Sequence, residues 1–298
     1  MFKKDFFGFK KPEIKKLNVD LDIFKEEKKM LEKFVKMKNK DNWENVRKAE
    51  GNFELVELEF PFGVRKSYKP ITEENNFNLQ ASRGLGINNN TDMAEIIEEV
   101  ESHLAIQESD IVRMEEVDII FKEIENLPSE NSHFHLIKNY LTRHREGVCE
   151  IGFRTHKLMN YYQERGHKKS IGYDINKFNV SISKKLGHDC RFYDLNNLEE
   201  DLDLKGISLI LSYHTLEHCS NPLKAIEKIF DSSEDGTLFH VEVPIEPDGP
   251  RLQYGHLFAF HENDLINMLS LAGFDIISVS RQTHTGGPHI ERVCAVKK

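Results

Sequence analysis

From residue 146 to the end of the chain, short apolar runs alternate with segments of helical length, and this alternation constrains the fold more than any other feature. The first five runs are VCEIG at 148–152, SIGYDI at 170–175, CRFYD at 190–194, ISLILSYH at 207–214 and GTLFHVEVP at 236–244. The segments of helical length are 155–165, 177–186, 222–230 and 262–271. Parallel strands need crossover connections, which are usually helices, so the pattern predicts a mainly parallel sheet with helices on both faces.

The last two apolar runs, FDIISVS at 274–280 and HIERVCAV at 289–296, are joined by only eight residues. A connection this short joins antiparallel neighbours. We therefore predict the α/β class, with a doubly wound, mainly parallel seven-stranded sheet that ends in an antiparallel hairpin. We assign this Rossmann-like domain to residues 141–298.

Residues 1–140 show a different pattern. Apolar residues recur at helical spacing within 20–38, 93–104 and 117–127. FELVELEF at 53–60 alternates like a strand and is followed by Pro61, whereas residues 70–90 resemble a long loop. We predict a mainly helical N-terminal region that supplies a lid, an acceptor pocket or an interaction surface.

Composition and charge exclude several classes of protein. The chain has 298 residues, of which 39% are hydrophobic and 31% charged, and no apolar run approaches the ~20 residues that span a bilayer. The four cysteines form no CxxC pair, so we expect reduced thiols and a cytoplasmic location. Residues 1–48 carry 15 basic and 9 acidic side chains, a net charge of +6. Because the whole chain has a net charge of −9, the remaining residues carry −15. An acidic body argues against a nucleic-acid partner.

Acidic residues stand where three of the predicted strands end. Glu150 is followed by Gly152 and a turn, Asp174 ends the second run, and Asp194 ends the third. In an open α/β sheet, ligands bind outside the carboxyl ends of the strands. An acidic side chain about 20 residues beyond the first turn can accept hydrogen bonds from ribose hydroxyls. Turn or helix-cap duty is the alternative role for these aspartates.

Two motifs follow. Leu216-Glu217-His218 precedes Asn221-Pro222, and the segment from His256 to Phe260 precedes Leu265, Leu269 and Ala272-Gly273-Phe274. With the order of the apolar runs, these motifs resemble the class I S-adenosylmethionine-dependent methyltransferases, in particular the small-molecule group that includes the ubiquinone and menaquinone biosynthetic enzymes. The resemblance covers about residues 146–298.

The resemblance implies S-adenosylmethionine as the cofactor. The matching positions are Glu150 and Gly152 for the methionine part, Asp174 for the ribose, Asp194 for the adenine amino group, Leu195 beside the adenine ring, and Tyr213 and His214 near the sulfonium. The chain departs from the family in its first loop, where D/E-x-G-x-G-x-G is replaced by Glu150-Ile-Gly152-Phe-Arg154-Thr-His156. Arg154 could pair with the carboxylate of the methionine part. Alternatively, the site no longer binds cofactor and the chain is a catalytically degenerate binding or assembly protein.

Methyl transfer to a hydroxyl also requires removal of a proton, and a histidine with a pKa near neutrality is the natural base. We name His214 and His256 as the catalytic candidates, although each could be structural. Magnesium prefers oxygen ligands and the cluster here is rich in histidine, so we predict no metal. The expected function is methylation of a small-molecule acceptor, with a hydroxyl favoured and a sugar or surface-glycan precursor as the first choice. A homo-oligomer is possible.

Overall fold

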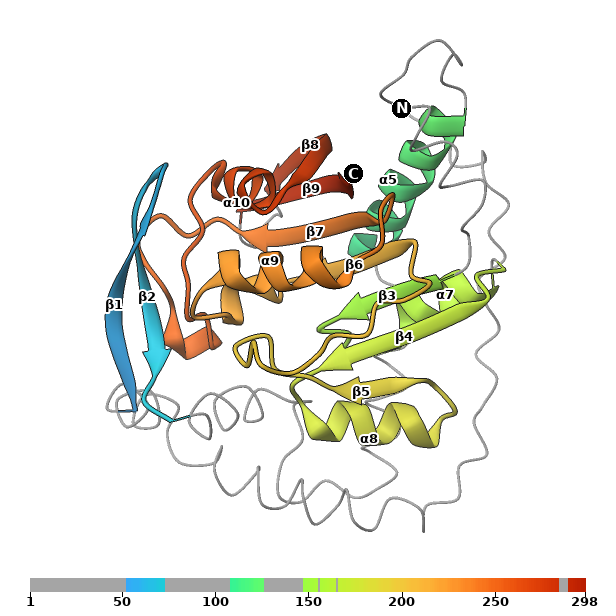
Figure 1. The fold of residues 1–298 in the computed structure, drawn as a ribbon, viewed down its shortest axis with the longest axis horizontal. Helices are drawn as coiled ribbons and strands as arrows, with labels where there is room; N and C mark the ends of the chain where they lie inside the picture. The colour runs from blue at the N-terminus through green and yellow to red at the C-terminus, as the bar shows by residue number, and fades with distance from the viewer. Residues whose placement is uncertain (1–51, 73–107, 126–146, 155, 165, 284–288) are drawn as a thin grey trace.

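The computed structural model describes residues 52–72, 108–125, 147–154, 156–164, 166–283 and 289–298. In this part of the chain, seven strands form one sheet in the order β5-β4-β3-β6-β7-β9-β8. Their bounds are β3 Gly147–Ile151, β4 Lys169–Asp174, β5 Cys190–Phe192, β6 Leu209–Tyr213, β7 Leu238–Pro244, β8 Phe274–Thr283 and β9 His289–Lys297. Figure 1 shows β4 and β5 on one side of β3, and β6 and β7 on the other. The switch in strand order therefore lies between β3 and β6.

The strand directions confirm the predicted fold class. Neighbouring strands from β5 to β7 are parallel, whereas β9 is antiparallel to both β7 and β8. Each of the seven predicted runs overlaps an observed strand. Strands β3 and β7 are buried along their whole length, as expected for a sheet that is covered on both faces.

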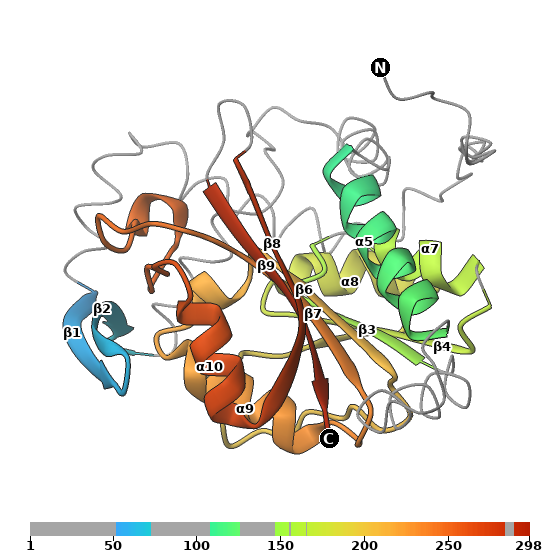
Figure 2. The ribbon, with the colours of Figure 1, turned by 90° about the horizontal axis from the view of Figure 1, so that it is seen from above.

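Helices cover both faces of this sheet (Figure 2). On one face lie α9 (Pro222–Ser232) and α10 (Asp264–Ala272), whose apolar residues pack in one core cluster with β6, β7 and β9. On the other face lie α7 (Lys157–Glu164) and α8 (Lys177–Lys185). Helix α9 begins at Pro222 because the Asn221 side chain accepts the N–H of Lys224 at 3.3 Å and proline suits the first helical position.

Helix α5 (Glu108–Glu125) joins the layer that contains α7 (Figure 2). Its residues Met114, Val117 and Ile120 are buried in the same cluster as Val148 of β3 and Leu209 of β6. The stripe predicted within 117–127 is therefore helical as far as Glu125, its last two residues lie outside the described part of the chain, and the buried residues of α5 cover the sheet. Helix α5 comes before residue 140, where we divided the chain, and yet it packs on the sheet. The division itself stays a prediction.

The described part of the first half also contains a β-hairpin, made of β1 (Phe53–Phe60) and β2 (Gly63–Pro70). The strand at 53–60 is confirmed, whereas β2 was not predicted. β2 attaches to the segment before α10, where the carbonyl of Leu257 accepts the N–H of Tyr68 at 2.7 Å. It also attaches to the start of α10, where Asp264 forms a bidentate pair with Arg65 at 2.6 and 2.7 Å. The hairpin therefore supports the loop that carries His256.

Several predictions for the first half lie outside the described residues. These are the helices at 20–38 and 93–104 and the part of the loop from residue 73 to residue 90. A mainly helical N-terminal region therefore stays a prediction. Within the described residues, every helix is too short or too polar to cross a bilayer.

Candidate functional site

The loop after β3 packs directly on the loop after β6, at the switch in strand order. Gly152 has φ 76°, and its N–H donates to the carbonyl of Tyr173 at 2.7 Å. A Cβ atom at this position would lie 2.1 Å from Oγ1 of Thr215. Only glycine fits here, both for its backbone conformation and for the space available.

The next position at which the resembled family has glycine is occupied by Arg154, with φ 42°. The loop thus keeps the left-handed backbone conformation although the residue has a side chain. The N–H of Arg154 donates to Oδ2 of Asp174 at 2.9 Å, and the N–H of Asn176 donates to Oδ1 at 2.7 Å. Burial raises the pKa of Asp174, and this effect is larger than that of the hydrogen bonds, which lower the pKa. Asp174 therefore holds the two loops in register, which is the turn role named as its alternative, and its ribose role stays a proposal.

The third glycine of the family pattern is replaced by His156, and this side chain is buried away from the loop. Its Nδ1 lies 3.1 Å from Oγ of Ser183 in α8, and its ring stacks on His188 with centroids 3.8 Å apart. Burial and the neighbouring His188 lower the pKa of His156 to about 3. The ring is therefore neutral at physiological pH and acts as a packing group between α8 and the start of α7.

Glu150 lies at the end of β3, below this loop. Its side chain is buried, and its Oε2 atom has no hydrogen-bond partner among the residues that the structure describes. Burial raises the pKa of Glu150 well above its usual range. A buried carboxyl oxygen without a donor is energetically costly and would be stabilised by a cationic ligand.

The remaining cofactor candidates differ in their surroundings. Oδ1 of Asp194 accepts the backbone N–H of Asn196 at 2.9 Å, so this carboxylate also stabilises its own turn. Leu195 is buried in the main core cluster. The hydroxyl of Tyr213 lies 2.7 Å from Nδ1 of His240. The binding roles of all three stay proposals.

His214, directly after β6, lies between two carboxylates. Its Nε2 is 3.0 Å from Oε1 of Glu242, and its Nδ1 is 3.4 Å from Oε1 of Glu217. Burial disfavours the charged ring, but the interactions with Glu217 and Glu242 outweigh it and raise the pKa of His214 to about 9. A protonated ring cannot accept a proton, so His214 lacks the near-neutral pKa that we expected of a base.

Glu242 connects this site to α5. Its carboxylate pairs with Arg113 of α5 and with Arg292 of β9, whose Nε donates at 2.8 Å. Burial favours the neutral acid, but the hydrogen bonds from His214 and Arg113 outweigh it and lower the pKa of Glu242. This role of Arg113 was not predicted, since the two residues of the pair are 129 positions apart and no motif contains the arginine.

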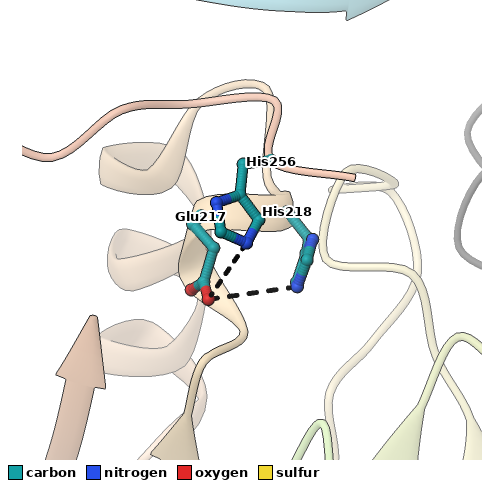
Figure 3. A group of neighbouring side chains, drawn as sticks. All are labelled: Glu217, His218 and His256. Atoms are coloured by element: carbon teal, nitrogen blue, oxygen red, sulfur yellow. Dashed lines mark ion pairs between the residues drawn. The ribbon is translucent and has the colours of Figure 1, made fainter. Parts of the chain in front are cut away.

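A second histidine cluster surrounds Glu217 (Figure 3). Nε2 of His218 and Nε2 of His256 each lie 4.0 Å from Oε1 of Glu217. The other ring nitrogens point outward: Nδ1 of His218 is 2.8 Å from the carbonyl of Gly255, and Nδ1 of His256 is 2.8 Å from Oε2 of Glu246. The two catalytic candidates, His214 and His256, therefore lie around one buried glutamate.

A comparison with models of protein families matches residues 125–279, more than half of the chain, to a family described as a methyltransferase domain. The chain belongs to this methyltransferase-domain family. No protein with curated information matches the chain. The match confirms the predicted resemblance at the level of the methyltransferase domain, whereas the quinone-type subgroup stays a prediction.

Solved structures similar to this methyltransferase have low sequence identity. An S-adenosylmethionine-dependent methyltransferase from Mesorhizobium loti is 14% identical over 57% of this chain and 99% of its own, with a TM-score of 0.45. The 1,6-didemethyltoxoflavin-N1-methyltransferase of Burkholderia thailandensis is 17% identical over 63% and 88%, with a TM-score of 0.42. The magnesium protoporphyrin IX methyltransferase of Synechocystis PCC 6803 is 15% identical over 64% and 100%, with a TM-score of 0.41.

At the carboxyl edge of this methyltransferase, the structure brings together most of the residues named from the sequence. Gly152 and Arg154 lie in the first loop, Glu150 precedes the loop in β3, and Asp174 accepts a hydrogen bond from the loop. Glu217 was quoted only as part of a motif, and its central position among the histidines was not foreseen. The signal was present, because Glu217 and His218 are adjacent in the Leu-Glu-His motif.

Proposed function

We propose that this chain is an S-adenosylmethionine-dependent methyltransferase that methylates a hydroxyl group of a small molecule. The observation that carries the proposal is the buried carboxylate of Glu150, which has no partner for Oε2 among the described residues and lies at the switch in strand order of a methyltransferase domain. This is where open α/β sheets bind their ligands.

The residues of this edge fit the chemistry of the cofactor. Its ammonium group and sulfonium are both positive, and Glu150 offers a carboxyl oxygen that lacks a donor among the described residues. Asp174 presents a carboxylate beside the first loop, and carboxylate oxygens can accept further hydrogen bonds from a diol. Arg154, like Gly152, has a left-handed backbone, so the loop keeps the shape that a second glycine would give it. We propose that the Arg154 guanidinium pairs with the carboxylate of the methionine part.

When bound, the cofactor supplies a methyl group on a positively charged sulfur, which is a good leaving group. The chain must then orient the acceptor and let its hydroxyl proton depart. His214 retains a proton at neutral pH, so it supplies positive charge near the reaction. His256 directs Nδ1–H to Glu246 and leaves Nε2 as a proton acceptor. We assign the acceptor proton to Nε2 of His256.

A sugar or surface-glycan precursor as the acceptor, a cytoplasmic location and a homo-oligomeric state are parts of the same proposal that rest on the sequence alone. The catalytically degenerate alternative is supported by the replacement of two family glycines by Arg154 and His156.

Calorimetric titration with S-adenosylhomocysteine separates these possibilities. We expect saturable binding in the micromolar range to the full chain. Glu150→Gln should weaken it roughly tenfold, because glutamine cannot ionise to pair with the ammonium group. Glu199→Gln, at an exposed position, is the matched control and should bind like the unmodified chain. Absence of binding at millimolar ligand would favour the degenerate alternative.

A further inference from the structure

We propose that Glu217, His218 and His256 form a binding site for a divalent transition-metal ion at the carboxyl edge of the sheet (Figure 3). His218 ends the 3₁₀ turn Leu216–His218, and His256 follows the 3₁₀ turn Leu252–Tyr254. Metal binding at these residues goes beyond the methyltransferase proposal and does not require it.

The hydrogen bonds of the two histidines fix their tautomers. The carbonyl of Gly255 and the carboxylate of Glu246 can only accept, so Nδ1 of His218 and Nδ1 of His256 carry the hydrogen. In the neutral rings, each Nε2 then presents a lone pair, and each lies on the side of Glu217. Histidines that bind metals in proteins use this arrangement, in which the second ring nitrogen donates to a carbonyl or carboxylate.

Glu217 provides a second, independent observation. Its side chain is 1% exposed, and neither carboxylate oxygen has a hydrogen-bond partner among the described residues. A buried carboxylate that faces two imidazole nitrogens requires positive charge nearby. Nδ1 of His214 lies 3.4 Å from Oε1, and an ion bound by Oε1 and the two Nε2 atoms would supply further positive charge.

The backbone holds the three groups in place. The N–H groups of Leu257 and Phe258 both donate to the carbonyl oxygen of Glu217, at 2.8 and 3.0 Å. These bonds fix the segment that carries His256 against the turn that carries His218. Hydrogen bonds of Ser67, which donates to the carbonyls of Ser220 at 2.6 Å and of Leu257 at 3.2 Å, fasten the same segment to β2.

The distances and donor types select the kind of metal. The three ligand atoms lie within 4.8 Å of one another. Metal bonds of ~2.0 to 2.2 Å place neighbouring ligands ~3 to 3.5 Å apart, so rotations that move each side chain by about 1 Å close the site. Two imidazoles and one carboxylate suit Zn²⁺, Mn²⁺, Fe²⁺ or Co²⁺, whereas Mg²⁺ and Ca²⁺ prefer oxygen ligands. The histidine content that argued against magnesium in the sequence thus favours a transition metal.

Three protein ligands leave coordination positions on the ion open. An acceptor hydroxyl could occupy one of them, and this step rests on the proposed function. An acceptor hydroxyl bound to the ion has a lowered pKa. Its O–H bond breaks with the proton released to solvent, and the oxygen lone pair forms the new bond to the methyl carbon. The electron pair of the breaking carbon–sulfur bond stays on sulfur. With the ion in place, His256 acts as a ligand and no longer as the proton acceptor.

Metal binding is measured on the full chain after chelation and dialysis, by calorimetric titration with Zn²⁺ and, separately, with Mn²⁺. We expect one saturable site per chain. His218→Ala and His256→Ala should each weaken binding roughly a hundredfold, and Glu246→Ala, which removes the acceptor of Nδ1, roughly tenfold. His289→Gln is the control, since this histidine pairs with Thr283 outside the cluster and its replacement should leave binding unchanged. X-ray absorption on the zinc complex should show imidazole scattering that decreases in His218→Ala.

Lack of saturable binding by the unmodified chain would overturn the proposal, as would binding that the His218 and His256 substitutions leave unchanged. A parallel titration with S-adenosylhomocysteine distinguishes the two proposals. Metal binding without cofactor binding would refute the proposed function and leave the metal site standing. Cofactor binding without metal binding would refute the metal site alone.

Discussion

Replacement of Gly152 by alanine should destabilise the protein more than the same replacement at a glycine that has a left-handed backbone but free space around its Cα. Gly152 has φ 76°, and an added Cβ would lie 2.1 Å from Oγ1 and 2.8 Å from Cγ2 of Thr215. The left-handed conformation costs a residue with a side chain roughly 1–2 kcal/mol. The steric overlap adds about 1–3 kcal/mol, since Thr215 must shift together with the loop after β6. We therefore expect a loss of about 2–5 kcal/mol.

Gly187→Ala is the matched control, because Gly187 has φ 92° and an added Cβ there would meet no atom within 4 Å. It should cost only the roughly 1–2 kcal/mol of the backbone term. The free energies of unfolding are measured by urea denaturation of both variants, of Thr215→Ala and of Gly152→Ala/Thr215→Ala. In this double variant, much of the steric part should be recovered, because the two closest atoms of Thr215 are removed. A Gly152→Ala loss no larger than that of Gly187→Ala, or additive effects in the double variant, would refute the packing of the two loops.

Other predictions concern charges around the site. Arg65→Ala should cost about 3 kcal/mol of unfolding free energy, because it leaves the buried carboxylate of Asp264 without its bidentate partner, and Arg65→Lys should cost less. The lowered pKa of Glu242 in the folded state means that its contribution to stability is present above the unfolded pKa of about 4.5 and is lost as the pH falls below it. Urea denaturation from pH 6 down to about pH 3 should therefore show a decline in stability that is shallower in Glu242→Gln; equal slopes would contradict this assignment. Arg154→Gly should change stability by less than about 1 kcal/mol, since relief of the left-handed strain is offset by a more flexible unfolded chain, but should weaken S-adenosylhomocysteine binding roughly tenfold. Unchanged affinity would remove Arg154 from the cofactor site.

The fold could be predicted because its signals are local. The strands at 148–152 and 236–244 are apolar throughout, which is the pattern of a sheet buried on both faces. The antiparallel end followed from the eight residues between the last two runs. Strand β2 was missed because GVRKSYKP is largely polar, and within it only Ser67 is buried. Its position depends on contacts with residues almost 200 positions away, such as Leu257.

The site could be predicted in outline, because topology brings the ends of β3, β4 and β6 to one edge whatever their side chains contact. The partners of each side chain could not be predicted. His214 was chosen as a base from its place after a strand, yet its pKa depends on Glu242 of the neighbouring strand β7. His218 and His256 are 38 positions apart in sequence, and their approach to Glu217 depends on backbone bonds from Leu257 that no pattern reveals.

Binding of the cofactor at the edge next to Glu150 can be observed in the structure of the full chain bound to S-adenosylhomocysteine. The decisive quantity is the distance from the carboxylate of Glu150 to the ammonium nitrogen of the ligand. We predict a hydrogen bond of about 2.7–2.9 Å, with the ribose hydroxyls on Asp174. A ligand bound elsewhere on the chain, with no contact to Oε2 of Glu150, would show that this edge does not hold the cofactor.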